Sequence, residues 1–293
     1  MGRFHVGVSG WRYPSWRGDF YPKGLPQRLE LTYAAERMTS VELNGSFYSL
    51  QRPTSYVRWR EAVPPSVDLA VKGGRFITHL KALRDVETPL ANFFASGVLA
   101  LGDQLGPFLW QLPERVAFDA DRFGAFLELL PRTTTELADL ASRHDDKLDA
   151  DDALTSTDAD RRVRHALEPR HPSFDTDAAR SLCARHDVAL VVADTAGRFP
   201  VMRDATSDFR YVRLHGETEL YSGGYSDASL DRWARQCRAW ADEGHDVYVY
   251  CDNDIQGRAP YDAVALLERL DAAPVPPLRD IPPARRSRTR TTG

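Results

Sequence analysis

The stretch FRYVRLHG, residues 209–216, is a short strand-like run that ends in Arg213 and His215. Seven further runs end in the same way, with a polar residue at or near the tip. In chain order they are HVGVSGW (5–11), TSVELN (39–44), DLAVKG (68–73), PFLWQLP (107–113), VRHALEPRH (163–171), ALVVADT (189–195) and DVYVYCDND (246–254). Eight short strands, mostly separated by helical stretches, are typical of an α/β (β/α)8 TIM barrel, whose active sites lie at the C-terminal mouth.

The helical stretches fit this barrel. We expect helices near residues 27–38, 54–63, 89–101, 121–130, 134–144, 176–185, 226–244 and 259–270. The piece after the sixth strand, TAGRFPVMRDATSD, is too short and broken for a full helix, so one helix of the ring is predicted to be degenerate. A doubly wound open sheet is the competing architecture. It is disfavoured because GVSGWRYP, after the first strand, does not match the G-x-G-x-x-G phosphate fingerprint.

The 293 residues suit one barrel domain, which we place at residues 1–270. Within it, residues 133–162 form an acidic insertion between the fourth and fifth strands, which we expect to be partly disordered. Residues 271–293 are rich in Pro and Arg, with five arginines against two aspartates, and we expect a disordered tail. A solubilising or incidental tail is the favoured interpretation, and a weak contact with nucleic acid is the alternative.

Composition bears on the partners, the state of the cysteines and the cellular location of the protein. The formal net charge of −4 favours neither nucleic acid nor a membrane surface as a partner. The cysteines, Cys183, Cys237 and Cys251, lack metal-type spacing and are expected to be buried free thiols. No apolar run approaches the roughly 20 residues of a membrane span. Because the chain also begins almost at once with a strand, we expect a cytoplasmic protein without a membrane partner.

Alternation of side chains along a strand predicts what gathers at the mouth. The expected carboxylates are Glu42, Glu168, Asp194 and Asp252; the expected cations are Lys72, Arg170 and Arg213, with the imidazole of His215 beside them. Buried charges are costly unless they are paired, so one interpretation is a salt-bridge network that plugs the barrel top. The other is a polar pocket for an anionic ligand, in which arginine matches phosphate or carboxylate.

Metal and glycosidase chemistry stay open as alternatives. A divalent metal is possible if the carboxylates converge with His171 and His215, although three nearby cations would repel it and no H-x-x-x-H or H-E-x-x-H pairing exists. Glu42 and Glu168 would suit a glycosidase pair if their carboxyl groups had the required separation. Ser9 lacks a G-x-S-x-G elbow, which argues against a serine hydrolase.

Two loops carry aromatic residues that are expected to project from the mouth. Trp11 and Tyr13 follow the first strand, and Tyr221 and Tyr225 follow the seventh, where two adjacent glycines favour a mobile loop. Such rings stack against a base or a sugar, or cap the barrel rim as part of the apolar core. The pair Thr78–His79, after the third strand, is explained as well by a helix cap beside a surface histidine.

The motifs together resemble the domain-of-unknown-function seventy-two family, the YecE-like proteins, over residues 4–270. They are GVSGWRYPSWRGDFYP, SVELNGSFYSL, LAVKGGRFITH, LGPFLWQLP, ALEPRHPSF, VVADT, YVRLHGETELYSGGYSD and VYVYCDNDIQGRAPYDA. The resemblance implies a TIM barrel and supplies no established reaction. This sequence departs from the family pattern at Asp252, where an asparagine is usual, and at Gly45, where a small polar residue is expected.

The leading hypothesis is a hydrolase-like enzyme for a phosphate-bearing or otherwise anionic substrate, such as a nucleotide. Its catalytic candidates are Glu168, His215, Glu42 and Asp194. Its substrate-binding candidates are Lys72, Arg170, Arg213, Asn44, Gln111, Trp11, Tyr13, Tyr225 and Asn253. The rival hypothesis is a non-catalytic protein that binds a small molecule or nucleic acid through the same pocket.

Overall fold

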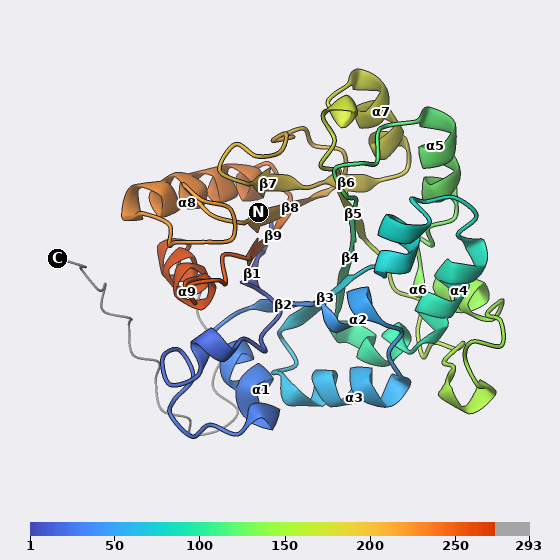
Figure 1. The fold of residues 1–293 in the computed structure, drawn as a ribbon, viewed down its shortest axis with the longest axis horizontal. Helices are drawn as coiled ribbons and strands as arrows, with labels where there is room; N and C mark the ends of the chain where they lie inside the picture. Colours follow the sequence, from blue (N-terminus) through green and yellow to red (C-terminus); the bar gives the residue numbers. More distant parts are fainter. Residues whose placement is uncertain (273–293) are drawn as a thin grey trace.

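The barrel sheet is entirely parallel. A computed structural model describes residues 1–272, viewed down the barrel in Figure 1. The strands are β1 (Phe4–Ser9), β2 (Ser40–Leu43), β3 (Asp68–Lys72), β4 (Leu105–Gln111), β5 (His165–Glu168), β6 (Val188–Leu190), β7 (Val192–Asp194), β8 (Phe209–Leu214) and β9 (Asp246–Cys251). They pair in the order β6-β5-β4-β3-β2-β1-β9-β8-β7. This is the predicted TIM-barrel arrangement.

One predicted strand is divided in two. The sixth strand, expected at residues 189–193, is present as β6 and β7, with Val191 between them. β6 pairs with β5, and β7 pairs with β8, so this stretch passes from one neighbour to the other and brings the two ends of the sheet together. The Val191 N–H still donates to Leu167 O at 2.9 Å. Nine labelled strands therefore correspond to the eight predicted strand positions.

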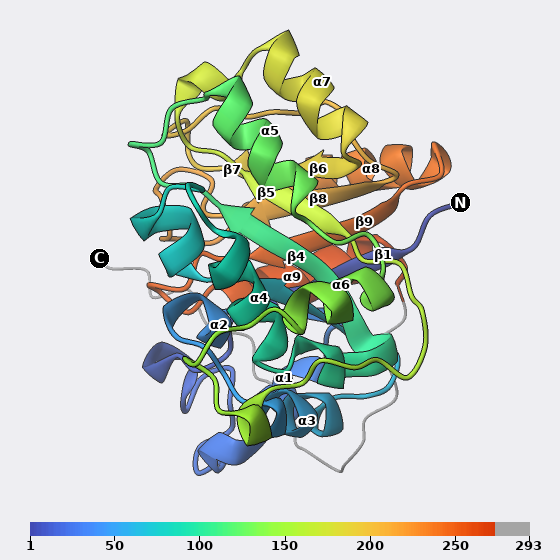
Figure 2. The same ribbon diagram turned by 90° about the vertical axis from the view of Figure 1, so that its right-hand side faces the viewer.

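Helices surround the sheet (Figures 1 and 2). They are α1 (Glu30–Ala35), α2 (Gly45–Tyr48), α3 (Pro53–Ala62), α4 (Glu87–Ala95), α5 (Ala120–Glu128), α6 (Thr134–Ala141), α7 (Asp177–Arg185), α8 (Asp227–Asp242) and α9 (Ala259–Arg269). Their starts follow local chemistry: Pro53 opens α3, and Ser226 accepts a hydrogen bond from Ser229 N at the start of α8. Residues 195–208 contain no helix, as predicted for the degenerate position.

The acidic insertion between β4 and β5 is tied to the barrel at several points. Its helix α6 packs against α4 (Figure 2). Asn92 on α4 donates to the Asp145 carboxylate at 2.8 Å, and Leu154 N donates to Ala95 O at 2.7 Å. Thr133 and Arg162 form an antiparallel bridge at its base. The disorder expected within residues 133–162 stays a prediction.

Two apolar clusters define the inside and the outside of the barrel. The inner cluster includes Ala193, Tyr211 and Tyr250, whereas Val192 and Val212 belong to the outer cluster, between strands and helices. Along β8 the inward positions therefore continue from Tyr211 to Arg213 and His215, as predicted. The three cysteines are buried and free. No helix within residues 1–272 is long and apolar enough to span a membrane. The predicted tail lies outside the described residues from position 273 onward.

Candidate functional site

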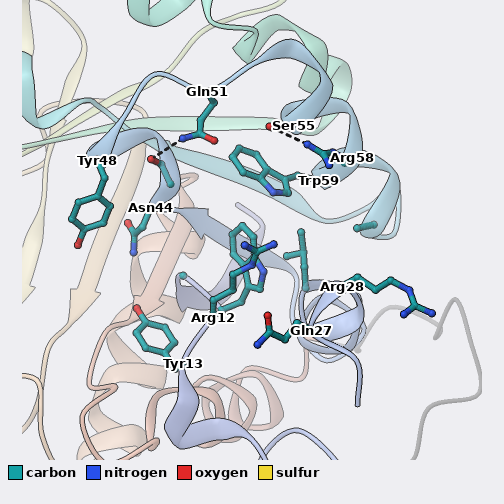
Figure 3. Close-up of a pocket in the computed structure, with 15 residues that line it drawn as sticks. Arg12, Tyr13, Gln27, Arg28, Asn44, Tyr48, Gln51, Ser55, Arg58 and Trp59 are labelled. Atoms are coloured by element: carbon teal, nitrogen blue, oxygen red, sulfur yellow. Dashed lines mark hydrogen bonds between the residues drawn. The ribbon is translucent and has the colours of Figure 1, made fainter. Parts of the chain in front are cut away.

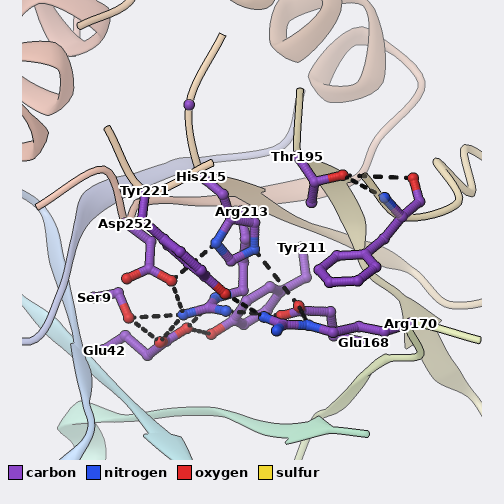
Figure 4. A network of polar contacts seen from close by, with 12 residues as sticks. Ser9, Glu42, Glu168, Arg170, Thr195, Tyr211, Arg213, His215, Tyr221 and Asp252 are labelled. Carbon is purple, nitrogen blue, oxygen red and sulfur yellow. Dashed lines mark hydrogen bonds and ion pairs between the residues drawn. The ribbon is translucent and has the colours of Figure 1, made fainter. Parts of the chain in front are cut away.

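Arg213 lies at the centre of the barrel mouth, between carboxylates from three other strand ends (Figure 4). Its Nη2 is 2.9 Å from Glu42 Oε1 and 2.9 Å from Asp252 Oδ2, and its Nη1 donates to Glu168 Oε2 at 2.8 Å. Its Nη2 also donates to Ser9 Oγ at 2.8 Å. Arg213, Glu42 and Glu168 are essentially inaccessible to solvent. The mouth is thus organised by a buried, fully paired guanidinium.

The second set of contacts extends from Glu168. Arg170 donates through Nε to Glu168 Oε1 at 3.0 Å and through Nη2 to the Tyr221 hydroxyl at 2.7 Å. His215 lies between two carboxylates, with Nε2 3.5 Å from Glu168 Oε1 and Nδ1 3.0 Å from Asp252 Oδ2. The ring of Tyr221 meets His215 edge-on at 5.2 Å. Glu168 therefore contacts both the Arg170 guanidinium and the His215 imidazole.

Lys72, at the end of β3, differs from the two arginines because no carboxylate pairs with it. Its Nζ lies 4.6 Å above the ring of Phe47, and it forms no hydrogen bond or ion pair with another residue of the described chain. Burial and the positive charge of Arg213 lower the pKa of Lys72 to about 8. The amine is consequently a buried cation near neutral pH that lacks a partner.

The carboxyl groups of the mouth have divergent pKa values. Burial raises the pKa of Glu168, but the guanidinium groups of Arg213 and Arg170 outweigh burial and hold it well below its usual range. At Asp252, Arg213 likewise outweighs burial and lowers the pKa to about 2. The pKa of the neighbouring Asp254 is raised well above its usual range by burial and by the charge on Asp252. Glu168 and Asp252 therefore stay ionised, and Asp254 holds its proton more strongly.

Most of the predicted site residues do meet at this mouth. The residues brought together there are Glu42, Asn44, Lys72, Glu168, Arg170, Arg213, His215 and Asp252. Asn44 joins the network because its Nδ2 donates to Ser9 Oγ at 2.9 Å. Gln111 is buried at the end of β4, two residues after Leu109 of the inner cluster. Trp11 and Tyr13 line a neighbouring cavity of about 670 Å³ (Figure 3).

Asp194 does not belong to this mouth, so the prediction that it faces the inside of the barrel is wrong. It shares the outward side of β7 with Val192, and the inward position is taken by Ala193. Burial raises the pKa of Asp194, while hydrogen bonds with Tyr225 and Trp233 lower it. Ala189, Val191 and Ala193 all face inward, so the alternation runs unbroken through this stretch, but a run of apolar residues does not show in the sequence which of its two faces points inward.

Tyr225 and Asn253 are also placed elsewhere, contrary to the predicted substrate-binding role. The buried Tyr225 hydroxyl accepts a hydrogen bond from Gly216 N at 3.1 Å. Asn253 is buried, and its Nδ2 donates to Gly223 O and to Asp262 Oδ2, each at 2.7 Å. The Asn253 side chain ties its loop to α9, and the Tyr225 side chain ties its own loop to Gly216. Tyr221, the other tyrosine predicted in this loop, is the one that contacts Arg170 and His215.

Arg213 contacts the protein through its whole guanidinium group. Its Nε and both Nη atoms donate to protein acceptors, as the salt-bridge interpretation predicts, so Arg213 organises the network; a contact with a substrate anion stays a prediction. The network also includes Tyr211, whose hydroxyl donates to Glu42 Oε2 at 2.7 Å. Sequence reasoning missed Tyr211, although the alternation that selects Arg213 and His215 selects it too. His79, discounted as a surface residue, lies near Lys72, because both contact the ring of Phe47, Lys72 Nζ at 4.6 Å and the His79 ring at 5.1 Å.

The geometry does not fit the metal alternative well. Within residues 1–272, no group of three His, Cys, Asp or Glu side chains is arranged to hold a metal ion. The space between Glu42, Glu168 and Asp252 is taken by the guanidinium of Arg213. His171 instead caps the turn that follows β5, by accepting from Ser173 N. The same pairing leaves neither Glu42 nor Glu168 free to act as a glycosidase carboxylate.

The class of fold defined by this barrel and its mouth is matched by known proteins. The family described as "Protein of unknown function DUF72" matches residues 5–286, and the chain belongs to this family. A DUF72 family protein from Thermotoga maritima MSB8 is 24% identical, with a TM-score of 0.71, and the match covers 92% of this chain and 99% of that chain. One from Enterococcus faecalis V583 is 15% identical, with a TM-score of 0.70, over 92% of this chain and 96% of that chain. These structures share the fold.

A curated relative is matched over a shorter segment. The UPF0759 protein YecE of Escherichia coli K12 is 28% identical over 112 residues. The match spans 37% of this chain and 37% of that protein, which is well under two thirds of either. The family assignment therefore rests on the match over nearly the whole chain, and the shorter match agrees with it.

Proposed function

We propose that the barrel mouth binds an anionic, phosphate-bearing substrate and acts on it as a hydrolase-like enzyme. The observation that carries this proposal is the unpaired, buried ammonium group of Lys72. An isolated charge inside a protein is costly, so its persistence favours a ligand that supplies the missing negative charge. Arg170 supports the same conclusion, because its Nη1 has no partner within the described chain.

The surroundings of His79 point to the same side of the mouth. Burial and the positive charges of Lys72, Arg115, Arg170 and Arg75 lower the pKa of His79 to about 4. The imidazole is therefore neutral at physiological pH and lies among cations. Arg115 also donates a hydrogen bond to the carbonyl oxygen of His79. An anion bound between Lys72 and Arg170 would enter a region of positive potential, which also favours its encounter rate.

The remaining groups have complementary roles in this proposal. Lys72 and Arg170 hold the anion, and Glu168 orients Arg170 and His215 while it stays ionised. His215 moves the proton between the substrate and the solvent, with Asp252 beside its Nδ1. Glu42 acts through Arg213 as a positioning residue. The neutral fraction of the Lys72 amine also offers a second proton acceptor near pH 8.

Access to His215 requires movement of the segment around Tyr221. His215 is fully buried beneath the Tyr221 ring. Tyr221 has φ of 62°, in the left-handed region that disfavours a non-glycine residue. A displacement of Tyr221 would relieve this strain, expose His215 and release Nη2 of Arg170 for the ligand.

A non-catalytic binding protein is the second candidate, and the burial of the network favours it. Glu42, Glu168, Arg213 and His215 are buried and paired in a way that suits a rigid scaffold. In this case Lys72 and Arg170 would retain the anion without turnover. A small molecule fits this mouth better than nucleic acid, because the two cations of the mouth, Lys72 and Arg170, lie inside the barrel end rather than along an exposed face.

The test combines binding and turnover. Inorganic phosphate is titrated calorimetrically into the wild type, Lys72→Met, Arg170→Met and the exposed-residue control Lys23→Met. We expect binding to the wild type and to the control, and a loss of at least about tenfold in affinity for each mouth variant, since a charge-assisted contact contributes that much. Phosphate release from a panel of phosphomonoesters then separates the candidates: release that is lost in His215→Gln supports the enzyme, and binding without release supports the binding protein. Equal binding by all four proteins contradicts the site.

A further inference from the structure

A second cavity, of about 670 Å³, lies beside the barrel mouth (Figure 3). Its walls come from the loop after β1, the start of α1, the short helix α2 and one side of α3. A volume of this size is in the range of small-molecule sites, which run from about 300 to 1,000 Å³. The cavity touches the central Arg213 network only along one wall, and no step of the proposed chemistry uses it.

The charge of this cavity has one sign. Its 15 lining residues include Arg12, Arg28 and Arg58 and no aspartate or glutamate. None of the three arginines forms an ion pair with another residue among positions 1–272; Arg58 donates only to Thr54 O and Ser55 Oγ. The three arginines are exposed, and because the lining contains no acidic residue they give the hollow a positive potential, which favours an anionic ligand.

Aromatic rings form much of the rest of the wall. Trp11, Tyr13, Tyr48 and Trp59 all line the cavity. Trp59 is fixed by edge-on contacts with Trp11 at 5.9 Å and with Tyr56 at 5.1 Å, so its ring is held in place without a ligand. Figure 3 shows Trp59 and Arg12 on facing sides of the space. A fixed indole opposite a guanidinium suits a ligand with a planar ring and an attached anionic group.

The cavity and the mouth share a wall. Asn44 lines the cavity, and its Nδ2 donates to Ser9 Oγ, which in turn accepts from Arg213. Tyr13, another lining residue, donates its hydroxyl to Ser9 O at 2.6 Å. Gly10 lies at this junction with φ of 82°, and a Cβ there would come within 3.0 Å of the Tyr13 hydroxyl. The shared wall is tightly packed. A ligand in the cavity would therefore be separated from the Arg213 network only by Asn44, Tyr13 and Ser9.

We infer that this cavity binds a free nucleoside monophosphate or a close analogue, with the planar base against Trp59 and the phosphate among the arginines. The limited volume favours one nucleotide over a strand, which would need an extended groove. The inference deepens the proposed function and rests on it in one respect. A nucleotide bound in the cavity would direct a substrate toward the adjacent mouth. Recognition at a distance from the reacting atoms is how binding energy contributes to orientation.

The experiment measures adenosine 5′-monophosphate binding calorimetrically. The proteins are the wild type, Arg12→Gln, Trp59→Leu, the conservative Trp59→Phe, the exposed-residue control Arg185→Gln and the mouth variant Lys72→Met. We expect affinity to fall at least about tenfold in Arg12→Gln and about fivefold or more in Trp59→Leu. Trp59→Phe and Arg185→Gln should stay within about twofold of the wild type, whereas Lys72→Met measures any share of the binding that takes place at the mouth. Thermal melting of each variant separates loss of binding from loss of folding.

Further ligands identify what is recognised. Adenosine alone and inorganic phosphate alone should each bind more weakly at the cavity than the monophosphate. A 5′-phosphorylated single-stranded oligonucleotide should gain no affinity over the monophosphate; tighter binding with a steep salt dependence overturns the assignment to a free nucleotide. Absence of any binding to the wild type overturns it as well.

The experiment can refute the cavity inference and the proposed function of the mouth independently of each other. If Lys72→Met abolishes monophosphate binding and Arg12→Gln does not, the anion sits at the mouth and the cavity inference is wrong. If monophosphate binding needs Arg12 while phosphate binding does not need Lys72, the cavity inference holds and the proposed function fails.

Discussion

Nη2 of Arg213 lies 2.9 Å from Oε1 of Glu42, and both side chains are shielded from solvent. The same guanidinium also pairs with Glu168 and Asp252. Removal of one partner from a buried ion pair leaves an uncompensated charge, so we expect Arg213→Met to lower the free energy of unfolding by about 3–5 kcal/mol. Urea denaturation followed by circular dichroism measures this change.

The matched control for this variant is Arg143→Met. Arg143 pairs with Glu87 at 2.7 Å, and both side chains are more than half exposed. Solvent screens such a pair, and we expect a loss below about 1 kcal/mol. If the two variants lose equal stability, the Arg213 network is not the electrostatic centre of the barrel.

The pKa of Lys72 gives a second prediction. Sulfate stays a dianion across the neutral and alkaline range, so any change in its affinity there reports on the protein. Because only the charged amine attracts an anion, affinity should be constant below about pH 8 and fall roughly tenfold per pH unit above it. Lys72→Arg keeps its charge at alkaline pH, and its sulfate affinity should stay flat from about pH 7 to 9.5. The same fall in both proteins would assign the titration to another group.

Asp194→Asn tests the corrected position of Asp194. Because its side chain is on the outward side of β7, loss of its charge should leave phosphate affinity within about twofold, as screening weakens distant charges. Arg170→Met is the comparison that should lose binding. A loss in Asp194→Asn as large as that in Arg170→Met would return Asp194 to the mouth.

Asp262 predicts a pH dependence of stability. Burial raises its pKa to about 6, even though its Oδ2 accepts hydrogen bonds from Asn253 and from Tyr225 N. The folded state therefore binds more protons than the unfolded state between about pH 4 and 6, and Asp262 lowers stability as pH rises through that window. Asp262→Asn keeps both hydrogen bonds and should remove up to about 3 kcal/mol of this fall. Parallel pH profiles of wild type and variant in chemical denaturation would contradict it.

The barrel was predictable because its strands carry their own signal. Alternation in FRYVRLHG places Tyr211, Arg213 and His215 on one face, and the structure places them inside. The same rule fails at residues 188–194 because a strand of buried small apolar residues carries no contrast between its faces. Its division at Val191 depends on pairing with β5 on one side and β8 on the other, which only the closed barrel determines.

The residues that meet at the site could be predicted from the sequence, but the role of each residue was harder to predict. Glu42, Lys72, Glu168 and Arg213 converge because parallel strands end at the same rim. Which cation is paired and which is left unpaired depends on distances of a few ångströms across the barrel. Arg213 was expected to hold the ligand, yet three carboxylates surround it, whereas Lys72 lies against Phe47 without one. The sequence shows the charges but not their pairing.

The most direct test is a crystal structure of the wild type grown with selenate, an anomalous scatterer with the charge and shape of sulfate. We predict an anomalous peak whose oxygen atoms lie about 2.7–3.2 Å from Lys72 Nζ and Arg170 Nη1. Peaks confined to the cavity of Arg12 and Trp59, or to the outer surface, with none at Lys72, would contradict the anion site at the barrel mouth.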